Sequence, residues 1–468
     1  MFNSRTRDNS ILDLVYLVPA ALFFLVAYLW KGSLASWDEA IYAEVAKQVV
    51  LSGDWLHLSW AGAPWVDKPP LAIWATALIY KLFGISEWTA RLFSALCGVG
   101  TVILTYFIGR NLISRWAGFL AAGVLLSSLH FIRFSRFGMM DAPVTFFLTL
   151  SLYFFWLGRE RNRYLIFSGL AFGLAFMTKS FAAFFILPIT WLYAWWAGEQ
   201  DILKRSTYWV GIILAVLIAL PWNLFQMLSS QPGFIQESLL KHFVLRTTQV
   251  VEGHAGSYYF YIRTLVNKYH PWILIGIFSA PWFLFKAIKD RSGEIVFLAS
   301  WMFSVFGIVT LMKTKIPWYI FPVYPALSLS VAYVLAKWVN ERYKTFMKVL
   351  FIVVLSLHVW YGRIFNQDYS RTIKGIAPSL EQRVPKDSIV YLYNYHGQPE
   401  GIFYLNRAVS YVDDENALAA AVKKNKGFYC LVFEKELKRF ESRLPELGLS
   451  VEGSFENLRF ITDQGKHP

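Results

Sequence analysis

Long apolar runs, separated by short polar turns, fill the first three quarters of the chain. A membrane-spanning helix needs about 20 mostly apolar residues, and about eleven runs reach or approach that length. The predicted spans are 11–30, 89–109, 116–132, 142–158, 164–178, 181–197, 208–228, 271–287, 294–312, 317–336 and 346–362. This pattern predicts an all-α polytopic membrane domain of about 11–13 transmembrane helices.

The composition is typical of a membrane protein and excludes an ordinary soluble one. Of the 468 residues, 56% are hydrophobic and 16% are charged, whereas a soluble protein has about 25% charged residues. The formal net charge of +14 would suggest a nucleic-acid partner in a soluble protein. In a membrane protein the same excess of Lys and Arg is explained by basic turns, so no nucleic-acid partner is expected.

The turns alternate in character, and the alternation predicts the orientation of the chain. One set is short and basic: 110–115, 159–163, 204–205, 286–291 and 342–348. By the positive-inside rule these turns face the cytoplasm. The opposite side then carries two long loops, at 31–88 and 229–270. Because the number of spans is odd, the C-terminal tail is expected on that side too.

The tail after the last span has the mixed polarity of a small soluble domain. Its segments SIVYLYNY and GFYCLVF have the pattern of short strands. Its segments ENALAAAVKKN and EKELKRFESRL have the pattern of helices. We therefore expect a membrane domain over 1–362 and a C-terminal region over 363–468, with an α/β fold over about 380–468.

The first long loop begins with two carboxylates and a helical pattern. Asp38 and Glu39 follow the first span directly. Apolar residues then recur at helical spacing: Ile41, Val45, Val49 and Val50. Glu44 and Lys47 lie on the opposite face, so the pattern predicts an amphipathic helix on the membrane surface.

The same loop continues with a rigid turn, PWVDKPP. The two prolines fix the backbone, so Asp67 and Lys68 are expected to be held in place rather than mobile. A second surface helix is predicted over about 71–83.

Two more charged residues stand at the ends of predicted spans. Asp141 comes at the entrance of a span, where a carboxylate can simply cap the helix. Lys179 lies between two apolar helices, where a lysine can simply extend to the interface. Each residue is therefore a candidate for a site and also for a purely structural role.

The second long loop and a later connection supply further candidates on the same side. The loop offers His242, Arg246, Glu252 and His254, and the connection offers Lys313, Lys315 and Tyr319. Ionisable residues at membrane depth are costly and usually mark function. Carboxylates suit a general base or a metal site, and Lys and Arg suit a phosphate.

These motifs, in this order, resemble the ArnT-like glycosyltransferases, which are lipid A aminoarabinose transferases, and more distantly the protein O-mannosyltransferases. The segments are WDEAIYAEVAKQVVLSGDW, PWVDKPPLAIW, MMDAPVTFF, FMTKSF and KTKIPWYIFPVYPAL. The resemblance covers most of the membrane part. It implies a GT-C fold, with outer surface helices and an outer C-terminal domain. It also implies a multi-pass protein of the bacterial inner membrane with its active site on the periplasmic face.

Carried over position by position, the resemblance implies a role for nine residues. Asp38 and Asp141 would be the acids of the reaction centre. The residues that bind the substrate would be Tyr42, Lys68, Lys179, Arg246 and Tyr319. Asp67, where the aminoarabinose transferases have Glu, and His242 would hold a zinc ion. The donor would be a polyprenyl-phosphate sugar and the acceptor lipid A or a related glycolipid outside the cytoplasm, with inversion at the sugar.

One position departs from the family pattern and leaves the sugar and the acceptor open. Ile41 stands where aminoarabinose transferases have Arg. The alternative functions are a protein O-mannosyltransferase, a glycan ligase, and a transporter or flippase of lipid-linked sugars. Transporters often have internal repeats and binding residues near the midplane. This chain shows no evident repeat, and its candidates gather at one surface, so the pattern favours an enzyme.

Overall fold

The computed structural model describes residues 5–35, 37–229, 234–361, 364–365, 368–369, 371–395, 399–424 and 427–463. The chain divides into two compact units. The helical unit comprises Met1–Leu29, Asp54–Leu58 and Pro64–Phe365. The α/β unit comprises Trp30–Gly53, Ser59–Ala63 and Asn366–Pro468. The domain boundary expected at 362–363 stays a prediction, and the second unit also takes in part of the first long loop.

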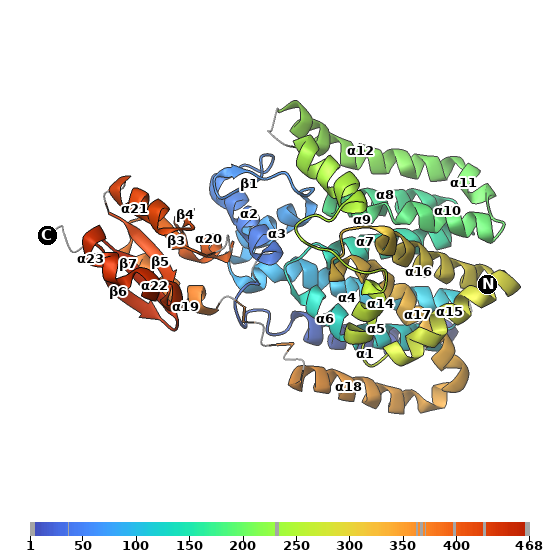
Figure 1. The fold of residues 1–468 in the computed structure, drawn as a ribbon. Coiled ribbons are helices and arrows are strands. Elements are labelled where there is room, and N and C mark those ends of the chain that lie inside the picture. Colours follow the sequence, from blue (N-terminus) through green and yellow to red (C-terminus); the bar gives the residue numbers. More distant parts are fainter. Residues whose placement is uncertain are drawn as a thin grey trace. The chain divides into compact units, whose positions relative to one another are not determined.

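Long helices that run side by side make up the helical unit (Figure 1). Six helices of the described chain are long and apolar enough to cross a membrane: α4 (Glu87–Leu112), α7 (Asp141–Gly158), α12 (Ser206–Leu228), α16 (Gly293–Leu311), η2 with α17 (Pro317–Val323, Tyr324–Trp338), and η3 with α18 (Glu341–Tyr343, Lys344–Trp360). A seventh span arises if the bent pair α5 (Arg115–Leu126) and α6 (Leu129–Arg136) is counted as one. The predicted class, a polytopic helical protein with a small C-terminal sheet, is confirmed.

Further helices complete the unit: α1 (Arg5–Val26), α3 (Leu71–Phe83), α8 (Arg163–Thr178), α9 (Ser180–Ala183), α10 (Ile186–Trp196), α11 (Asp201–Lys204), η1 (Ile235–Leu245), α13 (Arg246–Thr248), α14 (Phe260–Lys268) and α15 (Ile273–Asp290). Four apolar helices of 10–17 residues lie among them: residues 10–26, 71–83, 163–178 and 180–196. The expected total of 11–13 spans would have to include such helices, and it stays a prediction.

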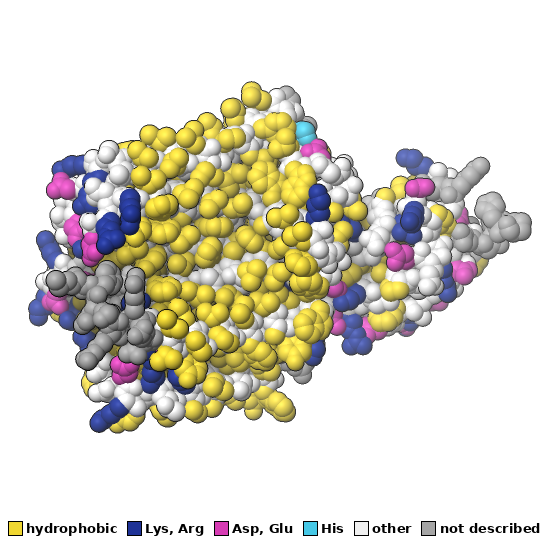
Figure 2. Space-filling view, turned by 180° about the vertical axis from the view of Figure 1, so that it is seen from behind, with side chains coloured by type: hydrophobic (Ala, Val, Ile, Leu, Met, Phe, Trp, Pro, Cys, Tyr) yellow, Lys and Arg dark blue, Asp and Glu magenta, His cyan; other side chains and the backbone are white. Residues whose placement is uncertain are grey.

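The surface of this unit fits a bilayer. A broad band of hydrophobic side chains crosses the face shown in Figure 2, and charged side chains gather at its two edges. Large apolar side chains of the helical unit are exposed, for example Leu217 on α12 and Phe278 on α15. Apolar surface on this scale is stable in lipid rather than in water.

Close helix contacts in the unit depend on small residues. Gly169 of α8 lies against Gly211 of α12, where an added Cβ would come within 2.0 Å of the Gly211 carbonyl oxygen. Apolar side chains gain little by leaving lipid for another apolar surface, so close backbone packing is what holds such helices together.

The predicted span 116–132 is broken where two serines follow each other. The Ser127 and Ser128 hydroxyls donate hydrogen bonds back to the carbonyls of Gly123 and Val124, at 2.5 and 2.8 Å. Such back-bonding competes with the helical ladder. At this break α5 ends and α6 leaves at 66°. The break directs α6 toward the start of α7, where Asp141 lies.

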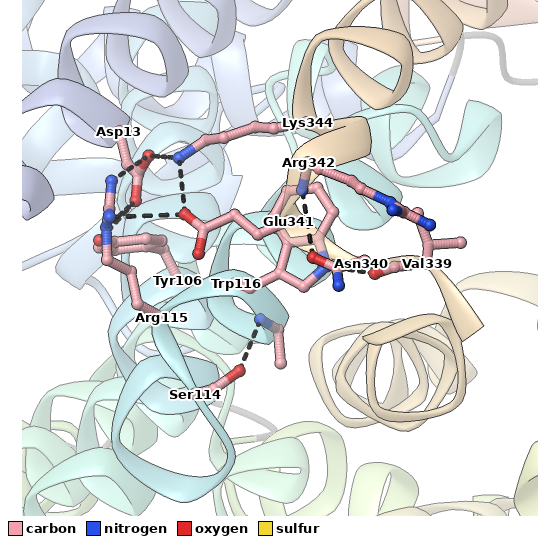
Figure 3. Close-up of polar contacts among 11 residues, drawn as sticks. Asp13, Tyr106, Ser114, Arg115, Trp116, Val339, Asn340, Glu341, Arg342 and Lys344 are labelled. Atoms are coloured by element: carbon pink, nitrogen blue, oxygen red, sulfur yellow. Dashed lines mark hydrogen bonds and ion pairs between the residues drawn. The ribbon is translucent and has the colours of Figure 1, made fainter. Parts of the chain in front are cut away.

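One buried carboxylate joins four segments of the helical unit (Figure 3). Asp13 of α1 is fully enclosed and accepts hydrogen bonds from Arg115 at 2.7 and 3.1 Å and from Tyr106 at 3.2 Å. Lys344, the first residue of α18, forms an ion pair with the same carboxylate, and Glu341 lies 3.6 Å from Arg115. We call these five residues the Asp13 cluster. It ties α1 and α18 to α4 and α5.

The C-terminal part of the α/β unit is a sheet with helices on both faces. Its strands are β3 (Ile389–Tyr393), β4 (Ala408–Val412), β5 (Tyr429–Phe433), β6 (Ser450–Phe455) and β7 (Leu458–Thr462), in the order β4-β3-β5-β7-β6. β3 is parallel to β4 and β5, and β7 is antiparallel to β5 and β6. The two strands and two helices predicted from sequence are confirmed by β3, β5, α21 and α22; three strands were not predicted.

Apolar residues fill both faces of this sheet. One core joins α19 (Arg371–Arg383) and α20 (Glu400–Leu405) to the sheet, and the other joins α21 (Glu415–Lys424), α22 (Glu434–Phe440) and α23 (Leu444–Leu447) to it. The short helix η4 (Glu441–Arg443) connects α22 and α23. The first long loop adds the pair β1 (Ser59–Trp60) and β2 (Ala63–Pro64).

The predicted helix in the first loop forms as α2 (Asp38–Ser52), but its polar face is not at a surface. Lys47 donates a hydrogen bond of 2.8 Å to the carbonyl of Phe403 and lies 3.3 Å from Glu44. Both charged residues are buried, and burial raises the pKa of Glu44 although Lys47 opposes the shift. The prediction of a helix with an open polar face is wrong, because α20 covers that face.

Candidate active site

Asp141 and Lys179 form a buried ion pair at one end of the helical unit. Asp141 is the first residue of α7, and Lys179 is the residue between α8 and α9. The Lys179 ammonium lies 2.7 Å from the Asp141 carboxylate, and the two side chains are only 12% and 5% exposed. Lys179 therefore does not extend to the interface. Asp141 is not the N-cap residue of α7, which is Met140.

Tyr319 links this pair to Arg246. The Lys179 ammonium lies 5.5 Å from the centre of the Tyr319 ring, within the range of a cation–π contact. The Tyr319 hydroxyl accepts a hydrogen bond of 2.7 Å from the Arg246 guanidinium. Arg246 is 9% exposed. Two cations from different loops are thus held around one aromatic ring.

A carboxylate completes the arrangement on the far side of Arg246. The Glu252 carboxylate lies 2.7 Å from Arg246 and 3.4 Å from Lys241. Burial alone would raise the pKa of Glu252, but Arg246 and Lys241 hold it below its usual value. We call these six residues the Lys179–Arg246 network: Asp141, Lys179, Lys241, Arg246, Glu252 and Tyr319.

Backbone pairing fixes the second loop against the connection that carries Tyr319. The amides of Lys313 and Thr314 donate to the carbonyls of Thr247 and Arg246, each at 3.1 Å. The Lys315 amide donates to the carbonyl of His254 at 2.8 Å. These bonds set the register that brings Arg246 onto the Tyr319 hydroxyl.

The network contains three cations and two carboxylates, so it carries excess positive charge. Lys and Arg held by packing and hydrogen bonds are suited to bind a phosphate, Arg through a planar fork of donors and Lys as a point charge. Charge that develops on a leaving phosphate would be stabilised by groups already in position. The arrangement is therefore chemically suited to phosphate-ester chemistry.

The sequence predicts four of the six network residues as site residues. Glu252 is a sequence candidate without a predicted role, and Lys241 carries no sequence signal for the site. The signal for Glu252 was the sequence Glu252-Gly253, where both residues adopt positive φ (56° and 73°). Such a turn places the carboxylate back over Arg246.

Asp67 and Lys68 lie in the proline-rich turn of the helical unit, as expected. Both are half-buried. The Lys68 ammonium lies 3.3 Å from the carbonyl oxygen of Asp67. The Trp65 amide donates to the Leu58 carbonyl at 2.8 Å, which holds the start of the turn.

Asp38 and Tyr42 belong to the α/β unit. Asp38 opens α2 and is half-buried, and Tyr42 is buried one turn later. The neighbouring Glu39 accepts a hydrogen bond of 2.6 Å from the Ala35 amide, so its carboxylate closes the turn before α2. Trp37, just before Asp38, has φ 65° and ψ −122°. A large residue in that region is strained, and such strain is concentrated at functional sites.

The residues that the structure describes do not assemble a metal site. They contain no group of three or more His, Cys, Asp or Glu side chains placed to hold an ion. Of the two zinc ligands implied by the resemblance, Asp67 is described, and the His242 side chain lies outside the described residues. The expected zinc site stays a prediction.

Comparisons with known proteins give the class of this fold. A family model described as dolichyl-phosphate-mannose-protein mannosyltransferase matches residues 67–225. The crystal structure of ArnT from Cupriavidus metallidurans bound to undecaprenyl phosphate superposes with a TM-score of 0.77 at 19% identity, over 96% of this chain and 98% of that one. The fold is that of the membrane-embedded GT-C glycosyltransferases.

Sequence relatives narrow the class to a family. An uncharacterized protein of Aquifex aeolicus is 31% identical over 78% of this chain and 72% of its own length. An undecaprenyl phosphate-alpha-4-amino-4-deoxy-L-arabinose arabinosyl transferase of Pseudomonas fluorescens is 29% identical over 67% of this chain, which spans 57% of that transferase. The chain belongs to the ArnT-like glycosyltransferases, a multi-pass membrane family, as the sequence motifs predict.

Proposed function

We propose that this protein transfers a sugar, with inversion, from a polyprenyl-phosphate donor to lipid A or a related glycolipid outside the cytoplasm. The observation that carries the proposal is the Lys179–Arg246 network, in which two largely enclosed cations are fixed around Tyr319. Support also comes from several relatives that are named undecaprenyl phosphate-alpha-4-amino-4-deoxy-L-arabinose arabinosyl transferases. A neighbour of the same fold binds undecaprenyl phosphate.

In the proposed reaction the acceptor oxygen attacks the anomeric carbon, and the bond from that carbon to the phosphate oxygen breaks. Positive charge builds at the sugar, and negative charge builds on the leaving polyprenyl phosphate. Lys179 and Arg246 would stabilise that negative charge without having to move, since Asp141 and Tyr319 already hold them. Single displacement from the opposite face inverts the sugar.

Two carboxylates are proposed to act on the acceptor side of the reaction. Asp38 is proposed to orient an acceptor hydroxyl and to take its proton. Asp141 is proposed as the second acid, and in the structure its carboxylate holds Lys179. An acceptor that is itself a phosphate is already a nucleophilic oxyanion and would need no base. Lys68 and Tyr42 are proposed to contact the donor.

The decisive assay supplies a defined undecaprenyl-phosphate sugar to the purified protein in nanodiscs. We expect free undecaprenyl phosphate and glycosylated lipid A to appear together, and Lys179→Met to reduce both by about 100-fold, as loss of a charge-stabilising group does. Lys313→Met is the matched control, because Lys313 is exposed and lies in the paired connection. Movement of intact donor across a bilayer, with no product formed, would instead establish the flippase alternative.

The location of the active site is proposed from charge. The basic turns would face the cytoplasm, and the network would face the periplasm of an inner-membrane protein. In intact cells a membrane-impermeant thiol reagent should label Asn406→Cys but not Asn162→Cys. The background is low because the native Cys97 and Cys430 are both buried. The reverse labelling pattern would contradict this orientation.

A further inference from the structure

A hollow of about 420 Å³ lies at the end of α17 that is opposite to Tyr319. Its walls come from the end of α4, the start of α16 and the end of α17, beside two of the basic turns. The volume falls in the range of about 300–1,000 Å³ that is typical of ligand pockets. The lining combines apolar side chains with five polar ones: Lys337, Glu294, Ser114, Ser292 and Tyr333.

Aromatic rings hold Lys337 at one wall of the hollow. Its ammonium lies 5.0 Å from the centre of the Trp282 ring and 4.5 Å from that of Tyr333. These two rings are 5.6 Å apart, so α15 and α17 meet here. Lys286 also lies over Trp282, at 5.1 Å, but it is paired with Asp290 at 3.0 Å. Lys337 forms no ion pair with any residue that the structure describes, so its donors are available to a ligand.

Glu294 supplies the opposite charge to the same hollow. It lies in the first turn of α16 and is half-buried. Arg159 approaches the preceding residue, since an added Cβ on Gly293 would lie 3.2 Å from the Arg159 Nη2 atom. The Arg159 guanidinium is already paired with Glu199, at 2.5 and 2.8 Å. Across the described part of the chain Glu294 has no hydrogen bond or ion pair, so its carboxylate oxygens can accept from a ligand.

The helix ends around the hollow also carry exposed apolar side chains. Phe285 and Ile288, near the end of α15, are each 61% exposed, and Trp338, next to Lys337, is 83% exposed. In a membrane-spanning unit, apolar surface of this kind faces lipid or the edge of the bilayer. Charged groups beside such a surface suit an amphiphile, with its head group in the hollow and its acyl chains along the apolar side chains.

We propose that this hollow binds phosphatidylethanolamine, a zwitterionic phospholipid, in the leaflet on the side of the basic turns. Its phosphodiester carries one negative charge and would pair with Lys337. Its primary ammonium carries one positive charge and three donors, and would pair with Glu294. An anionic phospholipid would leave Glu294 without a partner, and the quaternary ammonium of phosphatidylcholine has no N–H to donate. The site is independent of the proposed sugar transfer, which uses none of these residues.

Lipid binding measured without turnover tests the proposal. The full-length protein, stripped of lipid in detergent, is titrated with phosphatidylethanolamine, phosphatidylcholine or phosphatidylglycerol of identical acyl chains, and bound lipids are counted by native mass spectrometry. The first phosphatidylethanolamine should bind about tenfold tighter than either other lipid, the gain expected from one charge-assisted hydrogen bond. Glu294→Gln should remove this preference without weakening phosphatidylglycerol. Lys337→Gln should weaken all three lipids, because each has a phosphate.

Two further variants locate the binding. Lys289→Gln removes an exposed charge from α15 outside the lining and should change no affinity. Ala336→Phe keeps every charge but fills part of the hollow, so it should weaken phosphatidylethanolamine at least as much as Glu294→Gln. The unfolding temperature of each lipid-free variant shows whether its fold is retained.

Each contrary result overturns a stated part of the proposal. Equal affinity of the wild type for the three lipids overturns the site as a whole. Equal weakening of phosphatidylethanolamine and phosphatidylglycerol by Glu294→Gln overturns the ammonium contact. A loss from Lys289→Gln as large as that from Lys337→Gln, or undiminished binding by Ala336→Phe, overturns the location.

Discussion

The Asp13 cluster and the Lys179–Arg246 network are built from the same kinds of side chain but differ in how the charge is used. In the first, one fully enclosed carboxylate receives Arg115, Tyr106 and Lys344, and its acceptor capacity is taken up by the protein. In the second, cations outnumber carboxylates, and one carboxylate, Glu252, has a side chain that is 46% exposed. A carboxylate whose hydrogen-bonding capacity is used up by neighbouring side chains stabilises the fold. A fixed group of cations that outnumbers its carboxylates is suited to bind an anionic ligand.

The largest expected effect is on the fold, from Asp13→Asn. The substitution leaves Arg115 and Lys344 without their buried counter-charge, and breaking such a pair costs about 3–5 kcal/mol. Unfolding of the purified protein in detergent should occur at a clearly lower temperature. Glu341→Gln is the control, because Glu341 is 54% exposed and should matter by less than about 1 kcal/mol. Equal losses from both variants would contradict the structural role given to Asp13.

The next effect is on turnover, from Asp38→Asn. The amide keeps the shape of the side chain and removes its charge, so the reaction rate should fall about 100-fold while donor affinity changes little, as for a group used chiefly in the transition state. Turnover and donor binding should be measured on the same preparation. Near-normal turnover with donor bound would remove Asp38 from the mechanism and leave Asp141 as the acid.

A smaller effect is expected from Tyr319→Phe. The ring and its contact with Lys179 remain, but Arg246 loses a hydrogen-bond acceptor at 2.7 Å. Loss of one positioning bond of this kind corresponds to about a tenfold drop in donor affinity. Titration with undecaprenyl phosphate measures it, and Tyr261→Phe, in the adjoining helix, serves as the control. An unchanged affinity would mean that Glu252 alone positions Arg246.

The smallest effect, on the free energy of unfolding, is expected from Glu252→Gln. Its pKa is depressed by Arg246 and Lys241, so the carboxylate is ionised across neutral pH. Its contribution to stability is therefore present above its ordinary pKa of about 4.5 and lost only as the pH falls through the lower folded value. Glu252→Gln should change the unfolding free energy at pH 7 by less than about 1 kcal/mol. A stability difference between wild type and variant that varied between pH 6 and 8 would contradict this assignment.

Sequence patterns predicted the elements well because each depends on local periodicity. Runs of about 20 apolar residues located the spans, and the motif around Asp38 located α2. The break at Ser127–Ser128 was not predicted, since serines inside a span are common and only tertiary contacts decide whether they bend it. The short strands β4, β6 and β7 have no strong alternation and depend on β3 and β5 for their place.

The site was predictable as a set of residues but not as a geometry. Arg246 and Tyr319 are 73 positions apart, and the backbone pairing that joins them has no sequence signature. Lys179 had a valid structural explanation until its side chain was seen to face Asp141 rather than the interface. The burial of Glu44 and Lys47 was likewise unforeseeable, because the chain that covers them lies near residue 403.

The contact between Lys47 and Phe403 has a consequence for how the protein is made. The two residues are separated by 356 positions, and translation proceeds at about 5–20 residues per second. Helix α2 therefore emerges roughly 20–70 seconds before the partner that covers it. During that interval Glu44 and Lys47 are uncovered, and a chain cut short before α20 would never cover them. Lys47 would then pair only with Glu44 and lack its acceptor on residue 403, so the final packing of the first loop depends on completion of the chain.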